Sequence, residues 1–527
     1  MSAVRVPLPG SRGRPTSFLA VAGLTAYALA VGTYFVARTG GLFADTDTSL
    51  LTRVARSMSD DGRLIPESGY VYANGYGYPL LLVVGAQMSG LSIAFIQQVV
   101  GPLAAALLIL PAWVLYRELT GSARAATLAT LILFVQPELL FVLLRGSHER
   151  LLRSLMLVAL WLLVRSARLR DRPAALAAHV GLFYFVAYAL IATNALFGIS
   201  FLTAIFLALV VAWIVGRLPV GAFGDASRLA GRLAWVTLAV TCLGFVFVFY
   251  LYAPAGAGVQ LLGTIPKKLA ALFLTTSEQA ANPYGAVSRG WISVPVYFLL
   301  STATYLLMIS SAVVWMHQGL TWVRRRGAQP APGPLLGWLF FAGFASQGVL
   351  AAIGDVTGML GGNLQHRSFP SFAIAASPLV ADVLSRARPP ALGRLLPGAG
   401  LAVLAGFAIL KATNEPTLSN KWTLYTPSEL QSLAWVREHM SYETVWVGLD
   451  ERLATAAEIG LQGDSGTVEW NIYTPSPGTR LFLVSDLIRL QSARFEQPMP
   501  PLDGANRLYD RGDVQLYALP ARTAYQR

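Results

Sequence analysis

The sequence predicts an α-helical protein that crosses a membrane about eleven times and ends in a small α/β domain. Three observations lead to this fold class. Hydrophobic residues make up 55% of the 527 residues and charged residues only 13%, whereas a soluble globular chain has about 25% charged residues. The apolar residues gather in runs long enough to cross a hydrocarbon core about 30 Å thick. After Thr413 the composition becomes that of an ordinary soluble domain.

The first predicted span follows a basic amino terminus with three arginines in its first 14 residues. A charged start is typical of a signal peptide, but the apolar stretch Ser17–Ala37 exceeds the roughly 7–15 residues of a cleaved signal. We therefore expect an uncleaved helix whose amino terminus lies in the cytoplasm. The polar segment Arg38–Tyr78 is then the first external loop, and the short apolar stretch Pro79–Leu91 a re-entrant or interfacial helix.

Ten further apolar runs are expected to span the membrane. Their approximate bounds are 93–116, 126–144, 150–166, 174–192, 195–216, 233–253, 294–316, 334–354, 369–387 and 395–413. The loops expected on the cytoplasmic side are rich in arginine, as the positive-inside rule requires. We expect a transmembrane domain over residues 1–413 and a soluble extracytoplasmic domain over residues 414–527, in a multi-pass protein of the cytoplasmic membrane.

The soluble domain combines strand-like runs with one amphipathic helix. The strand-like runs include 444–448, 481–484 and 514–517. The helix is expected over about 428–440, with Ser428 as its N-cap and Gln431 as the capping-box partner.

The placement of the charges excludes some functions. The net charge of +13 does not indicate nucleic-acid binding, because the basic residues lie in short clusters between apolar runs, where they set orientation. The single cysteine, Cys242, allows no disulfide within the chain and no cysteine zinc cluster. Glu138 falls inside a predicted span, and an acidic residue at membrane depth is a functional candidate by default.

Two polar clusters lie early on the face that we expect to be external. Asp45 and Asp47 follow the first span, and two carboxylates so close together suit a divalent cation or a general base. Residues 145–150 join the third and fourth spans, where Glu149 could complete the same metal or acceptor site with His148 as a ligand. The plainer interpretations are a solvated turn and a cluster of long side chains at a helix end.

Two further clusters lie later in the chain. The long external loop before the eighth span contains Lys267, Lys268 and Glu278, and lysines on the external side suit an anionic ligand such as a lipid phosphate. His366 and Arg367 open the tenth span, where an arginine can bind a phosphate with two hydrogen bonds. Contact with lipid headgroups is the simpler interpretation of both clusters.

The order of these clusters resembles the GT-C membrane glycosyltransferases and, within them, the catalytic subunit of oligosaccharyltransferase. That family has an acidic motif in the first external loop and an Asp-x-Glu-type motif after the third span. A Thr/Ser-x-x-Glu motif follows in a long external loop, and an Arg-Phe/Tyr element opens a late helix. The matching residues here are Asp45 and Asp47, Ser147-His148-Glu149, Thr275-Thr276-Ser277-Glu278, and Arg367-Ser368-Phe369.

The soluble domain is also similar to that family, with one departure. Residues 433–439 are similar to the helix after the last span, and residues 509–517 to a closing hairpin. The Trp-Trp-Asp-Tyr-Gly motif that reads the protein acceptor is replaced by the sequence Val445-Trp446-Val447-Gly448-Leu449-Asp450-Glu451. This departure favours an acceptor other than the asparagine of a protein sequon.

The resemblance implies transfer of a sugar or glycan from a polyprenyl-phosphate or polyprenyl-diphosphate donor to an extracytoplasmic protein, lipid or glycan. A divalent cation, Mg²⁺ or Mn²⁺, is a possible cofactor. The implied roles are a base at Asp45 or Asp47, metal contacts at Asp47, His148 and Glu149, acceptor or metal contact at Glu278, and donor-phosphate contacts at Lys267, Lys268, His366 and Arg367.

Two alternatives stay open at this stage. One is a protein glycosyltransferase of the oligosaccharyltransferase type. The other is a transporter or flippase for lipid-linked sugars, which the nearly charge-free spans disfavour because such a path across the bilayer is lined with charged residues.

Overall fold

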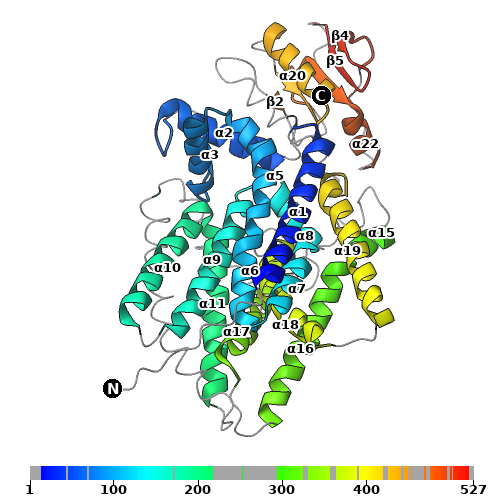
Figure 1. Cartoon of the computed structure of the whole chain (residues 1–527). Helices are drawn as coiled ribbons and strands as arrows, with labels where there is room; N and C mark the ends of the chain where they lie inside the picture. Colours follow the sequence, from blue (N-terminus) through cyan, green and yellow to red (C-terminus); the bar gives the residue numbers. More distant parts are fainter. Residues whose placement is uncertain are drawn as a thin grey trace, which may run out of the picture.

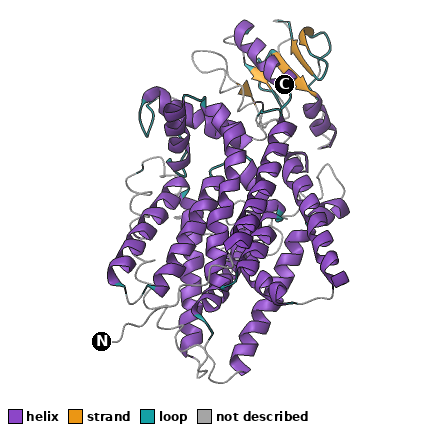
Figure 2. Cartoon of the chain, in the orientation of Figure 1, coloured by secondary structure: helices purple, strands orange, loops and turns teal. Residues whose placement is uncertain are grey.

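Long helices form most of the molecule, and a small sheet lies at one end of the helical bundle (Figures 1 and 2). The structure is a computed structural model. The residues that it describes are 14–42, 46–67, 71–169, 172–217, 242, 252, 294–324, 330–356, 364–387, 391–418, 425–440, 444–448, 453, 468–469, 475–494, 499–500 and 502–520.

Seven helices among the described residues are long and apolar enough to cross a membrane, and one sharply bent pair makes an eighth. The seven are α1 (Arg14–Thr39), the run from α4 to α6 (Ile93–Thr120), α10 (Pro173–Thr193), α11 (Ala195–Arg217), α16 (Thr302–Arg324), α17 (Pro332–Val356) and α18 (Leu364–Arg386). The run comprises α4 (Ile93–Phe95), η2 (Ile96–Val100), α5 (Gly101–Ala104), η3 (Ala105–Leu108) and α6 (Ile109–Thr120). The chain is a multi-pass membrane protein, as its composition predicted.

Every predicted span coincides with a helix except 233–253, of which the structure describes only residues 242 and 252. The fourth and eleventh correspond to α9 (Glu149–Arg168) and α19 (Ala391–Leu418), and the eighth to α16 with the short α15 (Val294–Leu300) before it. α9 is not among the seven because charged residues occupy both of its ends. The apolar part of α19 is only Gly398–Thr413, and the helix continues past the expected domain boundary at residue 413.

The third predicted span is broken in the middle. α7 (Ala123–Phe134) and α8 (Pro137–Leu144) meet at an angle of 72°. Pro137 is the first residue of α8, and Gln136 before it is extended, with φ −87° and ψ 117°. A proline disfavours the helical conformation in the preceding residue, so the helix ends before Gln136 and restarts in a new direction.

The predicted first loop contains a helix, α2 (Thr46–Asp61), and the short apolar stretch after it is α3 (Gly77–Ser89). α2 is amphipathic, and its buried face, which includes Leu51 and Val54, packs on Leu82 and Val83 of α3. The 13 residues of α3 are too few to cross a hydrocarbon core, which takes about 20.

The carboxyl-terminal domain is a five-stranded sheet in the order β2-β1-β3-β5-β4. Its strands are β1 (Val445–Trp446), β2 (Val468–Glu469), β3 (Leu481–Ser485), β4 (Asn506–Asp510) and β5 (Val514–Ala518), accompanied by helices α20 (Pro427–His439) and α22 (Asp486–Arg494). β1 is parallel to β2 and β3, whereas β5 is antiparallel to β3 and β4. The three predicted strands and the closing hairpin are confirmed.

The predicted N-cap of α20 is wrong by two residues. Thr426 caps the helix, and Glu429 completes the capping box with it. Pro427 explains the difference. Proline is favoured at the first helical position, so the helix begins at Pro427 and the cap is the residue before it, Thr426. Just before this cap, the Tyr425 hydroxyl is 3.1 Å from the Ser49 hydroxyl of α2, so the domain contacts the end of the bundle that holds α2.

A buried ion pair connects helices α8 and α19. Lys411 Nζ of α19 lies 2.8 Å from Glu138 Oε1 of α8, and the two side chains are 2% and 6% exposed. Thr304 of α16 donates to Glu138 Oε2 at 2.5 Å, and Lys411 lies 4.6 Å from the ring centre of Tyr297 in α15. Glu138, which the sequence marked as a functional candidate, therefore has a role in joining helices.

Replacing only one member of this ion pair should destabilise the protein more than replacing both. Lys411→Met leaves the buried Glu138 carboxylate without its ammonium partner, which costs about 3–5 kcal/mol. The double variant Glu138→Leu/Lys411→Met leaves no buried charge and should lose less than either single variant. Thermal unfolding of the purified variants in detergent measures this. A double variant as unstable as the sum of the two singles would contradict the ion pair.

Candidate functional site

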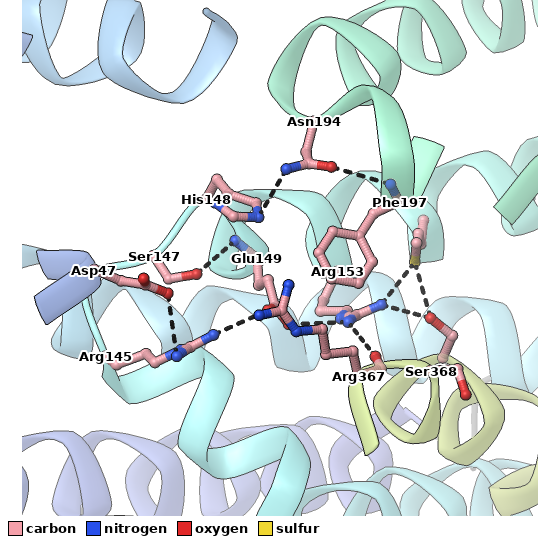
Figure 3. Close-up of polar contacts among 12 residues, drawn as sticks. Asp47, Arg145, Ser147, His148, Glu149, Arg153, Asn194, Phe197, Arg367 and Ser368 are labelled. Atoms are coloured by element: carbon pink, nitrogen blue, oxygen red, sulfur yellow. Dashed lines mark hydrogen bonds and ion pairs between the residues drawn. The ribbon is translucent and has the colours of Figure 1, made fainter. Parts of the chain in front are cut away.

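Polar side chains converge where the ends of α2, α8, α9 and α18 meet (Figure 3). The turn 145–148 between α8 and α9 lies at the centre. Gly146 N–H donates to Thr48 Oγ1 of α2 at 3.0 Å, and Gln97 Nε2 donates to the Gly146 carbonyl at 2.8 Å. A Cβ on Gly146 would lie 2.5 Å from the Thr48 methyl group. A glycine is therefore required at position 146 for the turn to pack against the start of α2.

Arg150 holds the end of α8 next to this turn. Its Nε donates to the Leu143 carbonyl at 2.7 Å, and its Nη2 donates to the carbonyls of Leu144 and Arg145 at 2.7 and 2.8 Å. The last carbonyls of a helix have no partner within the helix. Arg150 supplies that partner, so this member of the sequence cluster has a structural role.

Glu149 is the centre of a buried ion-pair network. Its Oε1 lies 3.0 Å from Arg145 Nη2, and its Oε2 lies 3.0 Å from Arg153 Nη2. Arg145 Nη1 continues the chain to Asp47 Oδ2 at 3.2 Å. Arg153, which has no exposed surface, donates to Ser371 Oγ at 2.5 Å. One carboxylate therefore links α2, α9 and α18.

The first turn of α18 is held from two sides. Arg153 Nη2 donates to the Arg367 carbonyl at 3.2 Å. The buried Asp355 at the end of α17 accepts the N–H groups of Leu364 and Gln365, each at 2.7 Å, on its two carboxylate oxygens. These contacts fix the backbone that carries Arg367, whose side chain is exposed.

The charges at the site do not balance. Among the described residues, the carboxylates of Asp47 and Glu149 pair with Arg145 and Arg153. Two further arginines lie at the same site: Arg150 donates to backbone carbonyls, and Arg367 is in the first turn of α18. A surplus of positive charge close to a membrane favours an anion with several oxygens, and guanidinium groups match the geometry of a phosphate.

His148 is neutral and is held by Asn194. Asn194 Oδ1 accepts the Phe197 N–H at 3.0 Å, which orients the amide so that its Nδ2 donates to His148 Nε2 at 3.0 Å. The ring proton is therefore assigned to Nδ1, which lies 3.4 Å from the Tyr72 hydroxyl. Burial lowers the pKa of His148 to about 4, so the ring carries no charge at neutral pH.

The described residues do not fit the metal site that the sequence predicted from Asp47, His148 and Glu149. Both oxygens of Glu149 face guanidinium groups, and His148 Nε2 already accepts a hydrogen bond. No group of three acidic, histidine or cysteine side chains among the described residues is placed to hold a metal ion. A cation bound with Asp45, which lies outside the described residues, stays a prediction.

The structure brings together some of the predicted site residues. Asp47, Glu149 and Arg367 share one network, and His148 is next to it (Figure 3). The side chain of His366 lies outside the described residues, as do the predicted site residues Asp45, Lys267, Lys268 and Glu278.

Three residues of the site were not predicted from the sequence. Arg153 lies four residues after Glu149, a spacing that places the two side chains on one face of a helix. Asn194 separates two long apolar runs, and an amide at such a break is a signal of helix capping. Tyr72 lies in a segment of several tyrosines, in which nothing distinguishes it from the others.

Comparison with solved structures identifies the fold. The archaeal oligosaccharyltransferase AglB from Archaeoglobus fulgidus, in complex with an inhibitory peptide and a dolichol-phosphate, matches with a TM-score of 0.57 and 11% identity, over 95% of this chain and 75% of that chain. The apo form of the Archaeoglobus fulgidus oligosaccharyltransferase matches with a TM-score of 0.59 and 11% identity, over 88% and 69%.

A third match is too weak to argue from. ArnT from Cupriavidus metallidurans aligns with a TM-score of 0.47 and 16% identity, over 97% of this chain and all of that chain. No protein-family model matches the sequence, and no curated protein matches it significantly. The chain has the GT-C fold of membrane glycosyltransferases, as the resemblance in its sequence indicated.

Replacing Glu149 by Gln tests its place in the network. The variant keeps the shape of the side chain, but it leaves the fully buried Arg153 without a carboxylate, so we expect a loss of about 3–5 kcal/mol in unfolding free energy. The control is Glu118→Gln, whose partner Arg165 is 41% exposed, where the loss should be below about 1 kcal/mol.

The same measurement examines the metal hypothesis. Because Glu149 is occupied by two arginines, Mg²⁺ or Mn²⁺ should not raise the melting temperature of the wild-type protein through this residue. A metal-dependent rise that disappears in Glu149→Gln would contradict the network and restore Glu149 as a ligand.

Proposed function

We propose that this protein is a membrane glycosyltransferase that moves a sugar or glycan from a polyprenyl-phosphate-linked donor to an extracytoplasmic acceptor. The observation that carries the proposal is the network around Glu149, which holds a partly exposed carboxylate, Asp47, and an exposed arginine, Arg367, at one site. The GT-C fold supports it, because one solved structure with this fold is described in complex with a dolichol-phosphate.

The two exposed groups have complementary tasks in such a reaction. The Asp47 carboxylate, 32% exposed, accepts the proton of the acceptor hydroxyl as that oxygen attacks the anomeric carbon. Arg367 binds the phosphate that leaves with the carrier and stabilises its developing negative charge. Asp45 is a second candidate base, and Lys267, Lys268 and His366 are further candidates for contact with the phosphate. Glu278 is a candidate for contact with the acceptor.

The membrane placement follows from the same proposal. The site lies at the end of the bundle that the carboxyl-terminal domain contacts through Ser49 and Tyr425. The arginine-rich loops predict that this end faces away from the cytoplasm, in the cytoplasmic membrane. The acceptor is therefore an extracytoplasmic protein, lipid or glycan.

Protein glycosylation is the second candidate for the acceptor. The oligosaccharyltransferase fold favours it, whereas the sequence Val445-Trp446-Val447-Gly448 in place of the acceptor-reading motif disfavours it. Mass spectrometry of envelope proteins, glycolipids and glycans from cells with and without this gene separates the two. Loss of glycans from asparagine side chains would identify the protein-directed reaction.

Two substitutions should separate catalysis from donor binding. Asp47→Asn should lower kcat by about 10²- to 10⁴-fold, because the amide cannot accept the proton. Arg367→Ala should raise the KM for the lipid-linked donor, because it removes the contact with the phosphate, and should also lower kcat, because it removes a charge that stabilises the leaving phosphate. Transfer of labelled sugar from a polyprenyl-phosphate donor to envelope acceptors, with purified protein in liposomes, measures both.

Matched controls lie on the same helices. Asp60→Asn changes an exposed aspartate at the far end of α2, and Arg386→Ala changes an exposed arginine at the far end of α18. Both should leave kcat and KM within about twofold of the wild type, as expected for substitutions away from a site. If Asp47→Asn and the variant in which both Asp45 and Asp47 are replaced were each fully active, the base would not lie in the first external loop. Transport of the lipid-linked sugar without any transfer would instead indicate a flippase.

A further inference from the structure

Tyr72 lies beside the network, and its hydroxyl oxygen is surrounded by donors. Asn194 Nδ2 donates to it at 3.2 Å and Asn74 Nδ2 at 3.5 Å. His148 Nδ1 lies 3.4 Å from the same oxygen, and it carries the ring proton because Nε2 accepts from Asn194. The orientation of Asn194 is itself fixed by its contact with the Phe197 N–H. Tyr72 therefore acts as an acceptor toward Asn194 and His148, which fills the two lone pairs of its oxygen.

This arrangement leaves the proton of the Tyr72 hydroxyl without an acceptor among the described residues. A tyrosine hydroxyl can donate one hydrogen bond as well as accept, and this one belongs to a half-buried side chain. Burial raises the pKa of the Tyr72 phenol to about 12, so the hydroxyl keeps this proton at neutral pH. The ring is also fixed in place, because its centre lies 5.6 Å from that of His148.

The hydroxyl of Tyr72 lies at the turn that carries the charged groups of the site. After burial and the bond from Asn74, the groups that shift the pKa of the Tyr72 phenol are Asp47 and Glu149, which raise it, and Arg367, which lowers it. Tyr72 contacts His148, which directly precedes Glu149 in the turn that also carries Arg145, the partner of Asp47. A hydroxyl donor at a site with surplus positive charge matches the oxygens of a phosphate.

We propose that Tyr72 donates a hydrogen bond to a phosphoryl oxygen of the lipid-linked donor, at the phosphate that Arg367 binds. This inference rests on the proposed function and assigns the site a binding residue that the sequence did not indicate. His148 and Asn194 are then positioning residues, because they direct hydrogen-bond donors at the Tyr72 oxygen and so turn its proton toward the substrate.

The test compares two ligands that differ only in the phosphate. Binding of a polyprenyl phosphate and of the corresponding neutral polyprenol is measured by native mass spectrometry or titration calorimetry on the detergent-purified full chain. Tyr72→Phe should weaken binding of the polyprenyl phosphate by about tenfold to a hundredfold, the range for a hydrogen bond to a charged group. Binding of the polyprenol should not change.

A merely structural role for Tyr72 gives a different result. Loss of the hydroxyl would then weaken both ligands alike or neither, and either outcome overturns the proposal. Tyr188→Phe is the matched control, because it removes a hydroxyl that lies 2.7 Å from that of Tyr76; it should leave the ratio of the two affinities unchanged.

Folding of the variant is controlled separately. Tyr72→Phe leaves the donors of Asn194 and His148 without an acceptor, so it can destabilise the site. If it does not fold, the double variant Tyr72→Phe/His148→Leu is compared with His148→Leu alone, and the phosphate-specific loss should appear in that comparison. Wild-type protein that does not bind polyprenyl phosphate would refute the proposed function itself, whereas equal phosphate binding by wild type and Tyr72→Phe would refute only this inference.

Discussion

The ion pairs of Glu149 are the interaction on which the site depends. A buried carboxylate is stable only when it has compensating partners, and Arg145 and Arg153 supply one for each oxygen. Through them the carboxylate connects Asp47 on α2 with the start of α18. The same network also explains how a fully buried arginine is tolerated at the end of a helix bundle.

The buried and the exposed charged residues of the site therefore have different roles. Glu149, Arg150 and Arg153 are buried, and each is used to hold a turn or a helix end. Asp47 is partly exposed and Arg367 is exposed, so part of each side chain is accessible to a substrate. A rigid charged support below two accessible groups is the arrangement that transition-state stabilisation needs, because the groups do not have to reorganise during the reaction.

The sequence predicted the parts of the structure that depend on local pattern. Long apolar runs identified the helices, and alternation identified the strands of the soluble domain. The order of short motifs indicated the GT-C fold and grouped Asp47, Glu149 and Arg367. These features can be recognised because each depends on composition or spacing within a few residues.

The sequence did not predict contacts between distant residues. The bond from Arg153 to Ser371 joins residues 218 positions apart, and no local pattern encodes it. The sequence shows Glu149 beside a histidine but not the two arginines that lie against its oxygens, so it does not reveal the ion pairs that this carboxylate makes. The N-cap of α20 is Thr426 and not Ser428 for a local reason, because Pro427 between them is favoured at the first helical position.

The central claim is that the network around Glu149 presents Asp47 and Arg367 to one lipid-linked phosphate. An experimental structure of the full chain in lipid nanodiscs with a polyprenyl phosphate tests it most directly. The account predicts the phosphate within hydrogen-bonding distance of the Arg367 guanidinium, on the side of the site where Asp47 is exposed. A phosphate bound elsewhere on the bundle, with Arg367 making no contact to it, would contradict the account.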